Sequence, residues 1–375
     1  MKLTSEQLKA LEIVERGHNV LVTGQAGTGK TSLVGAMFNQ LSKEGKKVEV
    51  VCASGIAGNA YSGKIRTSTA HAFYGLRTAD LPSELVIERA VANNLVAERV
   101  KSVDTVIWDE ISMSSRRVFE LANGIHVALS PSCDSSYLFG GKQVVLVGDF
   151  LQLRPVANFF DQGKFAFESP LFKCIPHRLE LTTILRQNES DKEFISCLKE
   201  IRLGQCEPES LAFIRNLTRD LPEEMKDDTV HIFFKRLPVQ MFNLKVLFSL
   251  PGDVHTFDAI DEGDVAGIQC PAERVVLLKP GCKVMLLWNK SENLRNGSQG
   301  RFVGVRGNNV IVHFEGVGET VVKRETWTKT SRNGDAVGSR TQISLSLMWG
   351  ITCHKSQGLT QIGRASCRER VYVLV

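Results

Sequence analysis

Short apolar runs alternate with helical patterns along the first part of the chain. Four of these runs are rich in valine and isoleucine, and each ends in small or polar residues; they cover residues 19–23, 48–53, 105–108 and 143–147. Runs of this kind are typical of buried parallel strands joined by crossover helices. The pattern therefore predicts an α/β fold, preceded by an amphipathic helix at the N-terminus.

Two changes of pattern divide the chain further. A charged helical insert over about 77–100 interrupts the series before the third strand. A second α/β unit is expected from Leu185, with a helix around 194–203. We therefore place a first lobe at 1–184 and a second lobe at 185–361.

The pattern changes again from about Val275. Two strand-like runs flank Pro280 and Gly281, and short valine-rich segments follow, separated by turns rich in glycine and asparagine. Hairpin turns need residues that tolerate positive φ, which these residue types supply. The pattern predicts a small antiparallel β-barrel over about 290–342. Because strand-like residues return at 343–352, we expect the barrel to be inserted into the second lobe.

Composition excludes several classes of protein. The chain has 375 residues, of which 43% are hydrophobic and 23% charged, so two domains with ordinary cores are expected. It has neither the roughly 20 unbroken apolar residues of a membrane span nor the apolar run of a signal peptide. The nine cysteines are scattered without a CxxC pair, which argues against a zinc site or a disulfide framework. We expect an intracellular protein with no membrane partner.

The last residues, 362–375, differ in character from the rest. The run IGRASCRERV resembles the translation of a common sequencing adapter, so we interpret 362–375 as a non-native tail and leave it out of the fold. A genuine basic tail is the alternative. The tail contributes three arginines and one glutamate, and without it the net charge falls from +5 to +3. The charge balance alone therefore does not demand a polyanionic partner.

The clearest chemical signal is a complete GxxxxGK[ST] motif that follows one predicted strand and begins a predicted helix. Its glycines let backbone N–H groups turn toward phosphate oxygens at the positive end of the helix. Lys30 would reach the β- and γ-phosphates, and the Thr31 hydroxyl would bind Mg²⁺. The alternative is a chance glycine-rich turn. The predicted nucleotide-binding residues here are Gly24, Gln25, Ala26, Gly27, Thr28, Gly29, Lys30 and Thr31.

Polar residues follow two further predicted strands. Asp109 and Glu110 end the third apolar run, where open α/β sheets bind their ligands. Asp109 would hold the metal through water, and Glu110 would polarise the attacking water. Gln152 follows the fourth run, and its amide suits a γ-phosphate sensor because it both donates and accepts hydrogen bonds. The alternative for the acidic pair is a solvated strand end.

With these residues in place, the chain resembles the PIF-type (petite integration frequency) DNA helicases, which belong to the 5′-to-3′ branch of superfamily one. The resemblance covers residues 3–361 and includes several motifs in order. They are LTSEQ at 3–7, DEIS at 109–112, GDFLQLRPV at 148–156, LRQ at 185–187 and HKSQG at 354–358. One departure within these motifs is Arg154, which replaces a usual proline and which we expect to be tolerated.

The resemblance implies roles that residue types alone do not specify. Gln7 would read adenine, Arg186 would cross the cleft between the lobes to the γ-phosphate, and Gly358 would line the nucleotide cleft. Hydroxyl, imidazole and ammonium donors suit DNA phosphates without reading sequence. The implied DNA-binding residues are Ser54, Thr69, His71, His354, Lys355 and Ser356.

The resemblance also implies an architecture and an activity. The expected fold is α/β, with two RecA-like P-loop lobes, a helical wedge insert in the first and an SH3-like β-barrel in the second. The expected activity is ATP hydrolysis with Mg²⁺ that drives 5′-to-3′ movement on single-stranded DNA and opens forked duplexes in repair, recombination and telomere maintenance. A monomer in the nucleus is expected, with the mitochondrion as the alternative compartment.

Other functions stay open at this point. The family's final motif, a strand followed by Ser-Arg, would fall where the adapter-like tail stands, so we expect the chain to be a fragment without a second arginine finger. One alternative is therefore an ATP-gated, single-stranded DNA-binding module without turnover. Another is the helicase domain of a Helitron-type transposon. A RecD-like repair helicase is the nearest cousin among related enzymes.

Overall fold

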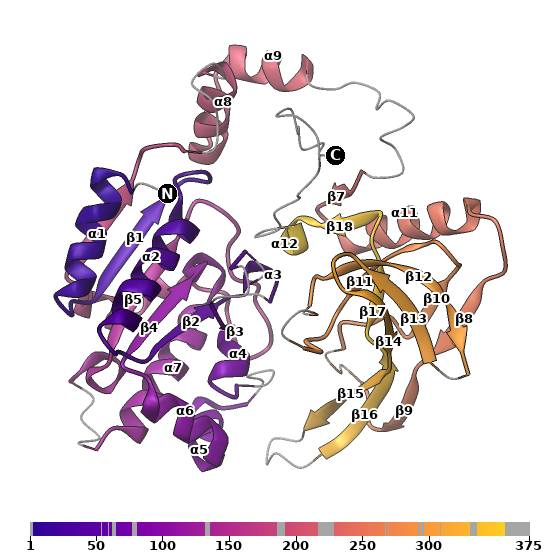
Figure 1. Cartoon of the computed structure of the whole chain (residues 1–375), viewed down its shortest axis with the longest axis horizontal. Helices are drawn as coiled ribbons and strands as arrows, with labels where there is room; N and C mark the ends of the chain where they lie inside the picture. Colours follow the sequence, from indigo (N-terminus) through magenta and orange to yellow (C-terminus); the bar gives the residue numbers. More distant parts are fainter. Residues whose placement is uncertain are drawn as a thin grey trace. The chain divides into compact units, whose positions relative to one another are not determined.

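The computed structural model divides the chain into two compact units, Met1–Thr218 and Arg219–Val375, each described here by itself (Figure 1). The residues that the structure describes are 3–53, 55–58, 60–61, 65–76, 81–131, 136–185, 192–216, 229–266, 268, 270–291, 294, 296–307, 309–330 and 336–356.

The first unit is built on a six-stranded sheet in which all neighbours run parallel, in the order β3-β2-β4-β5-β1-β6. Its strands are β1 (Val20–Gly24), β2 (Val48–Cys52), β3 (Thr67–Thr69), β4 (Thr105–Asp109), β5 (Gln143–Gly148) and β6 (His177–Leu181). The four predicted apolar runs form β1, β2, β4 and β5, so the α/β fold is confirmed. The pattern analysis identified neither β3 nor β6.

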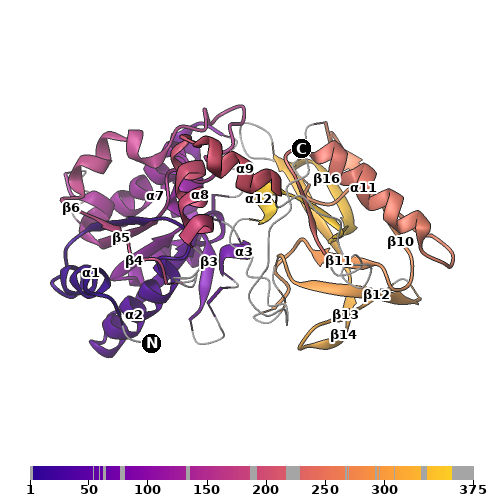
Figure 2. The same ribbon diagram turned by 90° about the horizontal axis from the view of Figure 1, so that it is seen from above.

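Helices cover both faces of this sheet (Figure 2). The longer helices that pack on the sheet are α1 (Ser5–Glu15), α2 (Lys30–Lys43), α5 (Ser83–Ala92), α6 (Asn94–Ser102) and α7 (Arg116–Leu129). Two further helices, α8 (Lys192–Leu203) and α9 (Pro208–Asn216), pack on each other. The short ones are α3 (Gly55–Gly58), α4 (Ala70–Phe73), η1 (Ile111–Met113), η2 (Leu138–Gly141), η3 (Ala166–Glu168) and η4 (Pro170–Cys174). The insert predicted before the third strand is helical, as α5 and α6.

Successive side chains of the central strands point to opposite faces of the sheet, so two hydrophobic cores form. In β4, Val106 and Trp108 pack with α5, α6 and α7, whereas Ile107 packs on the opposite face with α1 and α2. The same alternation sends Leu146 of β5 to the first core and Val145 to the second. Because each strand is apolar on both faces, it reads as a continuous apolar run. Phe73 and Tyr74, which could have stacked on bases, are core residues.

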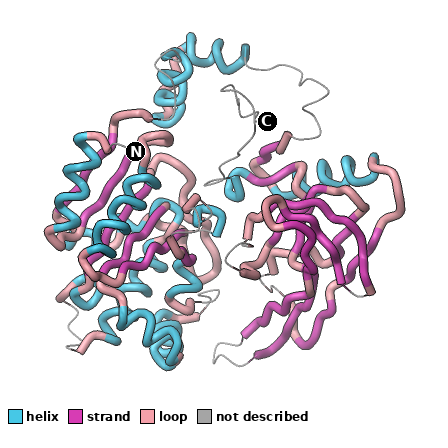
Figure 3. Tube along the Cα trace, viewed as in Figure 1, coloured by secondary structure: helices cyan, strands magenta, loops and turns pink. Residues whose placement is uncertain are grey.

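The second unit consists mainly of strands (Figure 3), most of which pair antiparallel. A five-stranded sheet has the order β14-β13-β12-β11-β17, a three-stranded sheet the order β15-β16-β9, and β10 pairs with β8. A parallel pair, β18 with β7, packs against α11. The elements are β7 (His231–Phe233), α11 (Arg236–Ser249), β8 (His255–Asp258), β9 (Ile260–Gly263), β10 (Val275–Leu278), β11 (Lys283–Leu286), β12 (Gln299–Arg306), β13 (Asn309–Phe314), β14 (Gly318–Val322), β15 (Arg324–Thr330), β16 (Ala336–Ile343), β17 (Leu345–Leu347), β18 (Gly350–Thr352) and α12 (Cys353–Ser356).

Glycine placement explains one of the hairpins in this unit. β13 and β14 pair up to Phe314 and Gly318, and both Gly316 (φ 74°) and Gly318 (φ 88°) adopt backbone angles that L side chains rarely take. The turn predicted from the Gly-Val-Gly sequence is therefore confirmed. No helix within the described residues is long and apolar enough to cross a membrane.

We expect the stability of the first unit to depend on pH because of His126, which lies on α7. The ring is buried, its Nε2 lies 3.2 Å from the Tyr74 hydroxyl, and burial together with the charge of Lys142 lowers its pKa to about 3. In the unfolded chain the imidazole titrates near its ordinary value of about 6.5. As the pH falls below that value, protons bind the unfolded state while the folded state stays neutral, so stability is lost between about pH 6.5 and pH 3.

We expect this group alone to lower the free energy of unfolding by about 2 kcal/mol between pH 7 and pH 5. Urea unfolding of the wild type and of His126→Gln at both pH values measures the difference. The variant should show a loss smaller by that amount, because it lacks the buried imidazole. Equal losses in the wild type and in His126→Gln would contradict the prediction.

Candidate functional site

The GxxxxGK[ST] segment forms a tight loop between β1 and α2. Gly27 (φ 89°) and Gly29 (φ 78°) adopt left-handed backbone angles that favour glycine. A Cβ atom on Gly24 would lie 2.8 Å from the carbonyl oxygen of Leu181 on the neighbouring strand β6. The loop thus requires its glycines, and α2 begins at Lys30, as an anion-binding helix N-terminus does.

Lys30 places a buried ammonium group at this loop. Its Nζ donates to the carbonyl oxygens of Gly24 at 2.7 Å and Gln25 at 3.0 Å. Burial lowers the pKa of the Lys30 amine, and the negative charges of Glu110, Asp149 and Asp109 oppose that shift. The loop therefore lies beside a cluster of three carboxylates that come from the ends of two other strands.

Asp109 ends β4 and is held by two hydrogen bonds. Its Oδ1 accepts from the backbone N–H of Glu110 at 2.9 Å, and its Oδ2 accepts from the Tyr61 hydroxyl at 2.5 Å. Burial raises the pKa of the Asp109 carboxyl, while both hydrogen bonds and the charge of Lys30 oppose the rise. Burial also raises the pKa of the Tyr61 phenol, and the charge of Asp109 raises it further, so Tyr61 stays neutral and acts as the donor.

Glu110 has a strained backbone. Its φ of 54° and ψ of 41° lie in the left-handed region, which is uncommon for a residue other than glycine. Strain of this kind collects at functional sites, where the surrounding structure enforces it. Here the turn redirects the chain from β4 into η1 directly after Asp109, so that two adjacent carboxylates occupy the end of one strand.

Asp149 and Gln152 follow β5. The Asp149 carboxylate is 1% exposed and accepts from the Gln152 amide at 3.1 Å. Arg202 of α8, itself 18% exposed, forms an ion pair with the same carboxylate, at 3.0 Å from Nε to Oδ2 and 3.1 Å from Nη2 to Oδ1. The orientation of Gln152 thus depends on a buried carboxylate whose charge is balanced by Arg202.

The oxygen donors beside the loop are suited to magnesium. Mg²⁺ prefers hard oxygen ligands and usually takes only one or two from the protein, together with phosphate oxygens and water. Thr31 supplies a hydroxyl and Asp109 a carboxylate. The described residues contain no group of three or more His, Cys, Asp and Glu side chains that could hold an ion by itself. The set therefore suits a metal that is bound jointly with a nucleotide.

Gln7 and Leu185 fix the loop from its other side. The Gln7 side chain is buried; its Nε2 donates to the carbonyls of Thr28 at 3.1 Å and Gly29 at 3.4 Å, and its Oε1 accepts from the N–H of Thr4. The backbone N–H of Leu185 donates to the carbonyl of Gly27 at 2.7 Å. The residue that precedes Arg186 is therefore anchored to the phosphate loop. Arg186 itself lies outside the described residues.

The predicted DNA-contact residues fall in both units. In the first unit, Thr69 ends β3 and caps α4, accepting from the N–H of Ala72 at 3.2 Å, and His71 lies in α4. In the second unit, Lys355 and Ser356 lie in α12 together with His354, whose side chain is outside the described part. Burial lowers the pKa of the Lys355 amine, and the charge of Arg236 lowers it further. Ser54 and Gly358 lie outside the described residues.

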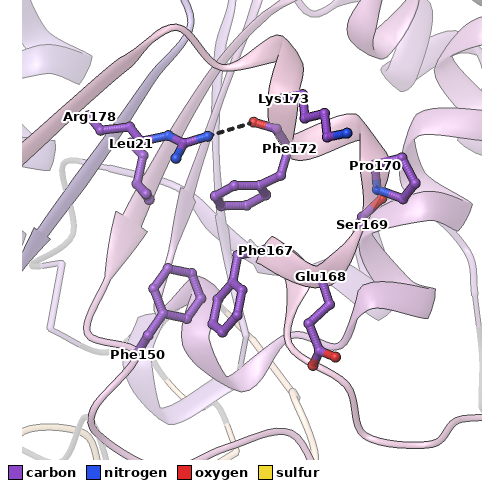
Figure 4. A pocket seen from close by; sticks show the side chains of 9 residues that line it. All are labelled: Leu21, Phe150, Phe167, Glu168, Ser169, Pro170, Phe172, Lys173 and Arg178. Carbon is purple, nitrogen blue, oxygen red and sulfur yellow. Dashed lines mark hydrogen bonds between the residues drawn. The ribbon is translucent and has the colours of Figure 1, made fainter.

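Arg154, the departure from the family motif, takes part in packing. Its guanidinium lies 5.4 Å from the centre of the Phe165 ring, a cation–π distance. Beside it, a cavity of about 520 Å³ is lined by Phe150, Phe167, Phe172 and polar residues at the rim (Figure 4). In that rim, Arg178 donates to the carbonyl of Phe172 at 3.4 Å. The cavity contains none of the predicted site residues.

Two residues of this site were not found from the sequence. Tyr61 and Arg202 contact Asp109 and Asp149 from positions 48 and 53 residues away, respectively. Neither belongs to a motif that specifies such a contact. A buried carboxylate requires donors or a cation, and this requirement indicates that partners exist without saying which residues they are.

Comparisons with known proteins identify the family of this chain. The model of the PIF1-like helicase family matches residues 2–211. The ATP-dependent DNA helicase PIF1 of Mus musculus is 33% identical over 393 residues, which cover 99% of this chain and 58% of the mouse protein. The human protein of the same name is 32% identical over 392 residues, with 99% and 58% covered. The chain thus spans less than two thirds of the length of these relatives.

Solved structures match along nearly the whole chain. The Pif1 helicase from Candida albicans aligns with a TM-score of 0.79 and 29% identity, covering 96% of this chain and 87% of that one. The Bacteroides Pif1 helicase in complex with ADP-AlF3 and single-stranded DNA aligns with a TM-score of 0.79 and 28% identity, covering 96% and 85%. With a family model that matches more than half of its residues, this chain belongs to the PIF1-like helicase family.

Proposed function

We propose that this chain is the motor of an ATP-dependent DNA helicase that moves 5′ to 3′ on single-stranded DNA and unwinds duplexes. The observation that carries the proposal is the charged cluster at the phosphate loop, where Lys30 lies among Asp109, Glu110 and Asp149. Relatives that match along nearly the whole chain are named ATP-dependent DNA helicases, and a Pif1 helicase from Bacteroides is solved in complex with ADP-AlF3 and single-stranded DNA.

In this proposal, ATP binds at the loop. Its phosphates accept from the backbone N–H groups of the loop and from Lys30, and Gln7 reads adenine. Thr31, and Asp109 through water, hold Mg²⁺, which neutralises the charge of the phosphates. Gly358 would line the cleft that binds the nucleotide. The support is the loop geometry, the buried ammonium of Lys30 and the oxygen donors beside it.

Hydrolysis requires a water molecule in line with the γ-phosphorus. Glu110 accepts a proton from that water as the new P–O bond forms, and the bond from the γ-phosphorus to the β–γ bridging oxygen breaks, which leaves ADP and phosphate. Gln152 senses the γ-phosphate, and Arg186 contacts it as an arginine finger. The support for this assignment is the preceding residue, Leu185, whose N–H donates to the carbonyl of Gly27 in the phosphate loop.

The DNA track uses residues of both units. Ser54, Thr69 and His71 in the first unit, and His354, Lys355 and Ser356 in the second, contact phosphates of the single strand. ATP binding and hydrolysis would close and open two RecA-like lobes, 1–184 and 185–361, around that strand. The helices α5 and α6 would act as a wedge at a DNA fork, and the antiparallel strands over about 290–342 would form an SH3-like barrel.

The biological setting follows from the same assignment. We propose a monomer that acts in genome maintenance, including repair, recombination and telomere maintenance, in the nucleus or alternatively the mitochondrion. Several of the curated relatives that match are eukaryotic PIF1 helicases. The test of the enzyme itself is ATP-dependent unwinding of a forked duplex.

Lys30→Ala should abolish ATP hydrolysis and retain DNA binding. Loss of the buried ammonium removes the main charge that stabilises the transferred phosphoryl group, so we expect a fall in kcat on the order of 10²-fold or more. Lys43→Ala, at the exposed end of the same helix, is the control. Phosphate release measures turnover, and fluorescence anisotropy with a labelled oligonucleotide measures DNA binding. Normal turnover by Lys30→Ala would overturn the phosphate-site assignment.

Unwinding should depend on the direction of the single-stranded tail. A duplex with a 5′ tail should be opened in the presence of ATP and Mg²⁺, and the same duplex with only a 3′ tail should not, because the motor starts on single strands and moves 5′ to 3′. A strand-displacement assay measures both. Equal opening of both substrates would contradict the polarity. ATP-dependent DNA affinity without turnover would instead favour the ATP-gated binding module.

Arg202→Ala should impair the site through Asp149. The substitution leaves a buried carboxylate without its cation, so we expect a loss of about 2–3 kcal/mol in the free energy of unfolding, together with reduced turnover from a displaced Gln152. In an Asp149→Asn background the same substitution should cost much less, because no buried charge remains. Arg116→Ala, which breaks a half-exposed pair with Glu120, should cost under about 0.5 kcal/mol. Additive losses in the double variant would contradict this role.

A further inference from the structure

A buried tyrosine hydroxyl connects the candidate DNA segment of the first unit to the candidate metal carboxylate. Tyr61 lies between β2 and β3 in the sequence, is 6% exposed and belongs to the hydrophobic core that includes the buried side chains of α2. Its hydroxyl donates to Oδ2 of Asp109 at 2.5 Å.

The contact fixes the direction of the carboxylate. Asp109 Oδ1 is already held by the backbone N–H of Glu110, so the two oxygens are fixed by donors from two different segments of the chain. A carboxylate that is free to turn would direct its remaining lone pairs variably toward a metal-bound water. One that is held at both oxygens presents them in a single direction, as residues that support metal ligands do.

Tyr61 is also tied to the segment that carries the DNA candidates. Its backbone N–H donates to the carbonyl of Gly58 in α3 at 3.2 Å, and the same carbonyl accepts from the Thr67 hydroxyl at 3.4 Å. Thr67 begins β3, which ends at Thr69, the N-cap of the helix that contains His71. Because the phenol ring is rigid, a shift of α3 or β3 moves the hydroxyl relative to Asp109.

We infer that Tyr61 is a positioning residue that couples DNA contact at Thr69 and His71 to the orientation of Asp109, and through it to binding of the Mg²⁺–nucleotide complex. The inference rests on the proposed function, because it assumes that Asp109 supports the metal and that these residues touch DNA. It assigns to Tyr61 no contact with DNA, nucleotide or metal. DNA bound at Thr69 and His71 then changes the affinity for the Mg²⁺–nucleotide complex at Asp109. The bound complex in turn changes the affinity for DNA by the same factor.

The test is Tyr61→Phe, which keeps the packed ring and removes only the hydroxyl. Tyr74→Phe is the matched control, because Tyr74 is a fully buried tyrosine of the same unit whose hydroxyl lies against His126. Equilibrium binding of a fluorescent ADP is measured with and without Mg²⁺ and with and without an oligo-dT strand. Turnover is measured alongside.

For Tyr61→Phe we expect unchanged nucleotide affinity without Mg²⁺ and about a tenfold smaller gain in affinity on adding Mg²⁺. The further gain on adding oligo-dT should fall by a similar factor, while DNA affinity without nucleotide stays as in the wild type. Tyr74→Phe should retain both gains. In an Asp109→Asn background, Tyr61→Phe should change neither gain further, because it acts through that carboxylate.

Three results would overturn the inference. The first is a Tyr61→Phe chain that keeps both gains within about twofold of the wild type. The second is an equal loss in Tyr74→Phe, which would mark a general effect of removing a buried hydroxyl. The third is a wild-type chain without a Mg²⁺-dependent gain. That result overturns the proposed function as well, whereas the first two leave the proposed function standing.

Discussion

Parallel pairing in the six-stranded sheet is the constraint on which the site depends. β1 pairs with β5 and β5 with β4, all in the same direction, so their carboxyl ends meet at one edge. The register matches Thr23 with Gly148, which places the phosphate loop and Asp149 directly after paired residues. Segments separated by more than a hundred residues are thereby brought to one place, where ligands of open α/β sheets bind.

Gathering carboxylates at a buried edge creates an electrostatic difficulty. An isolated buried carboxylate is unfavourable unless it is neutralised or bound by donors. Two of the three acidic residues here, Asp109 and Asp149, have a partner from another segment. Asp149 is bound by Arg202 of α8, and Asp109 by Tyr61 and the following backbone N–H. The hydrogen bonds from Tyr61 and from the backbone N–H favour the charged form of Asp109 near Lys30, and a charged carboxylate is what a metal ion beside a phosphate requires.

The sequence predicted those features that are encoded locally. The strands β1, β2, β4 and β5 are continuous apolar runs, and the phosphate loop is a contiguous motif with a strand before it and a helix after it. In contrast, β3 has only three residues, and β6 alternates exposed charged residues with partly buried ones, so neither shows a continuous apolar run. In the second unit, β11 lies between β12 and the distant β17, an arrangement set by tertiary pairing rather than by turns.

The candidate site likewise contains residues that local motifs predict and residues that only tertiary packing places. Lys30, Asp109, Glu110 and Gln152 stand in motifs, and the sheet brings their segments to one edge. Tyr61 and Arg202 stand in none, because nothing in the residues around them specifies a partner about fifty positions away. Reactive residues that are placed directly by the course of the backbone can be predicted from local patterns. The side chains that hold that chemistry in orientation follow from packing, which only the folded chain defines.

Gln7 takes part both in a local helix cap and in tertiary contacts with the phosphate loop. Its amide closes the capping box that begins α1, and its Nε2 donates to the carbonyls of Thr28 and Gly29. The amide nitrogen has two hydrogens, and Nε2 already donates to two loop carbonyls. A purine that accepts a hydrogen bond from Nε2 must therefore replace one of these two carbonyls as the acceptor. In the proposed role of Gln7, reading the base and shaping the phosphate loop would draw on the same donor. A base that engages Gln7 would alter the hydrogen bonding of the loop proposed to hold its phosphates, so that recognition at one end of the nucleotide would be transmitted to the other.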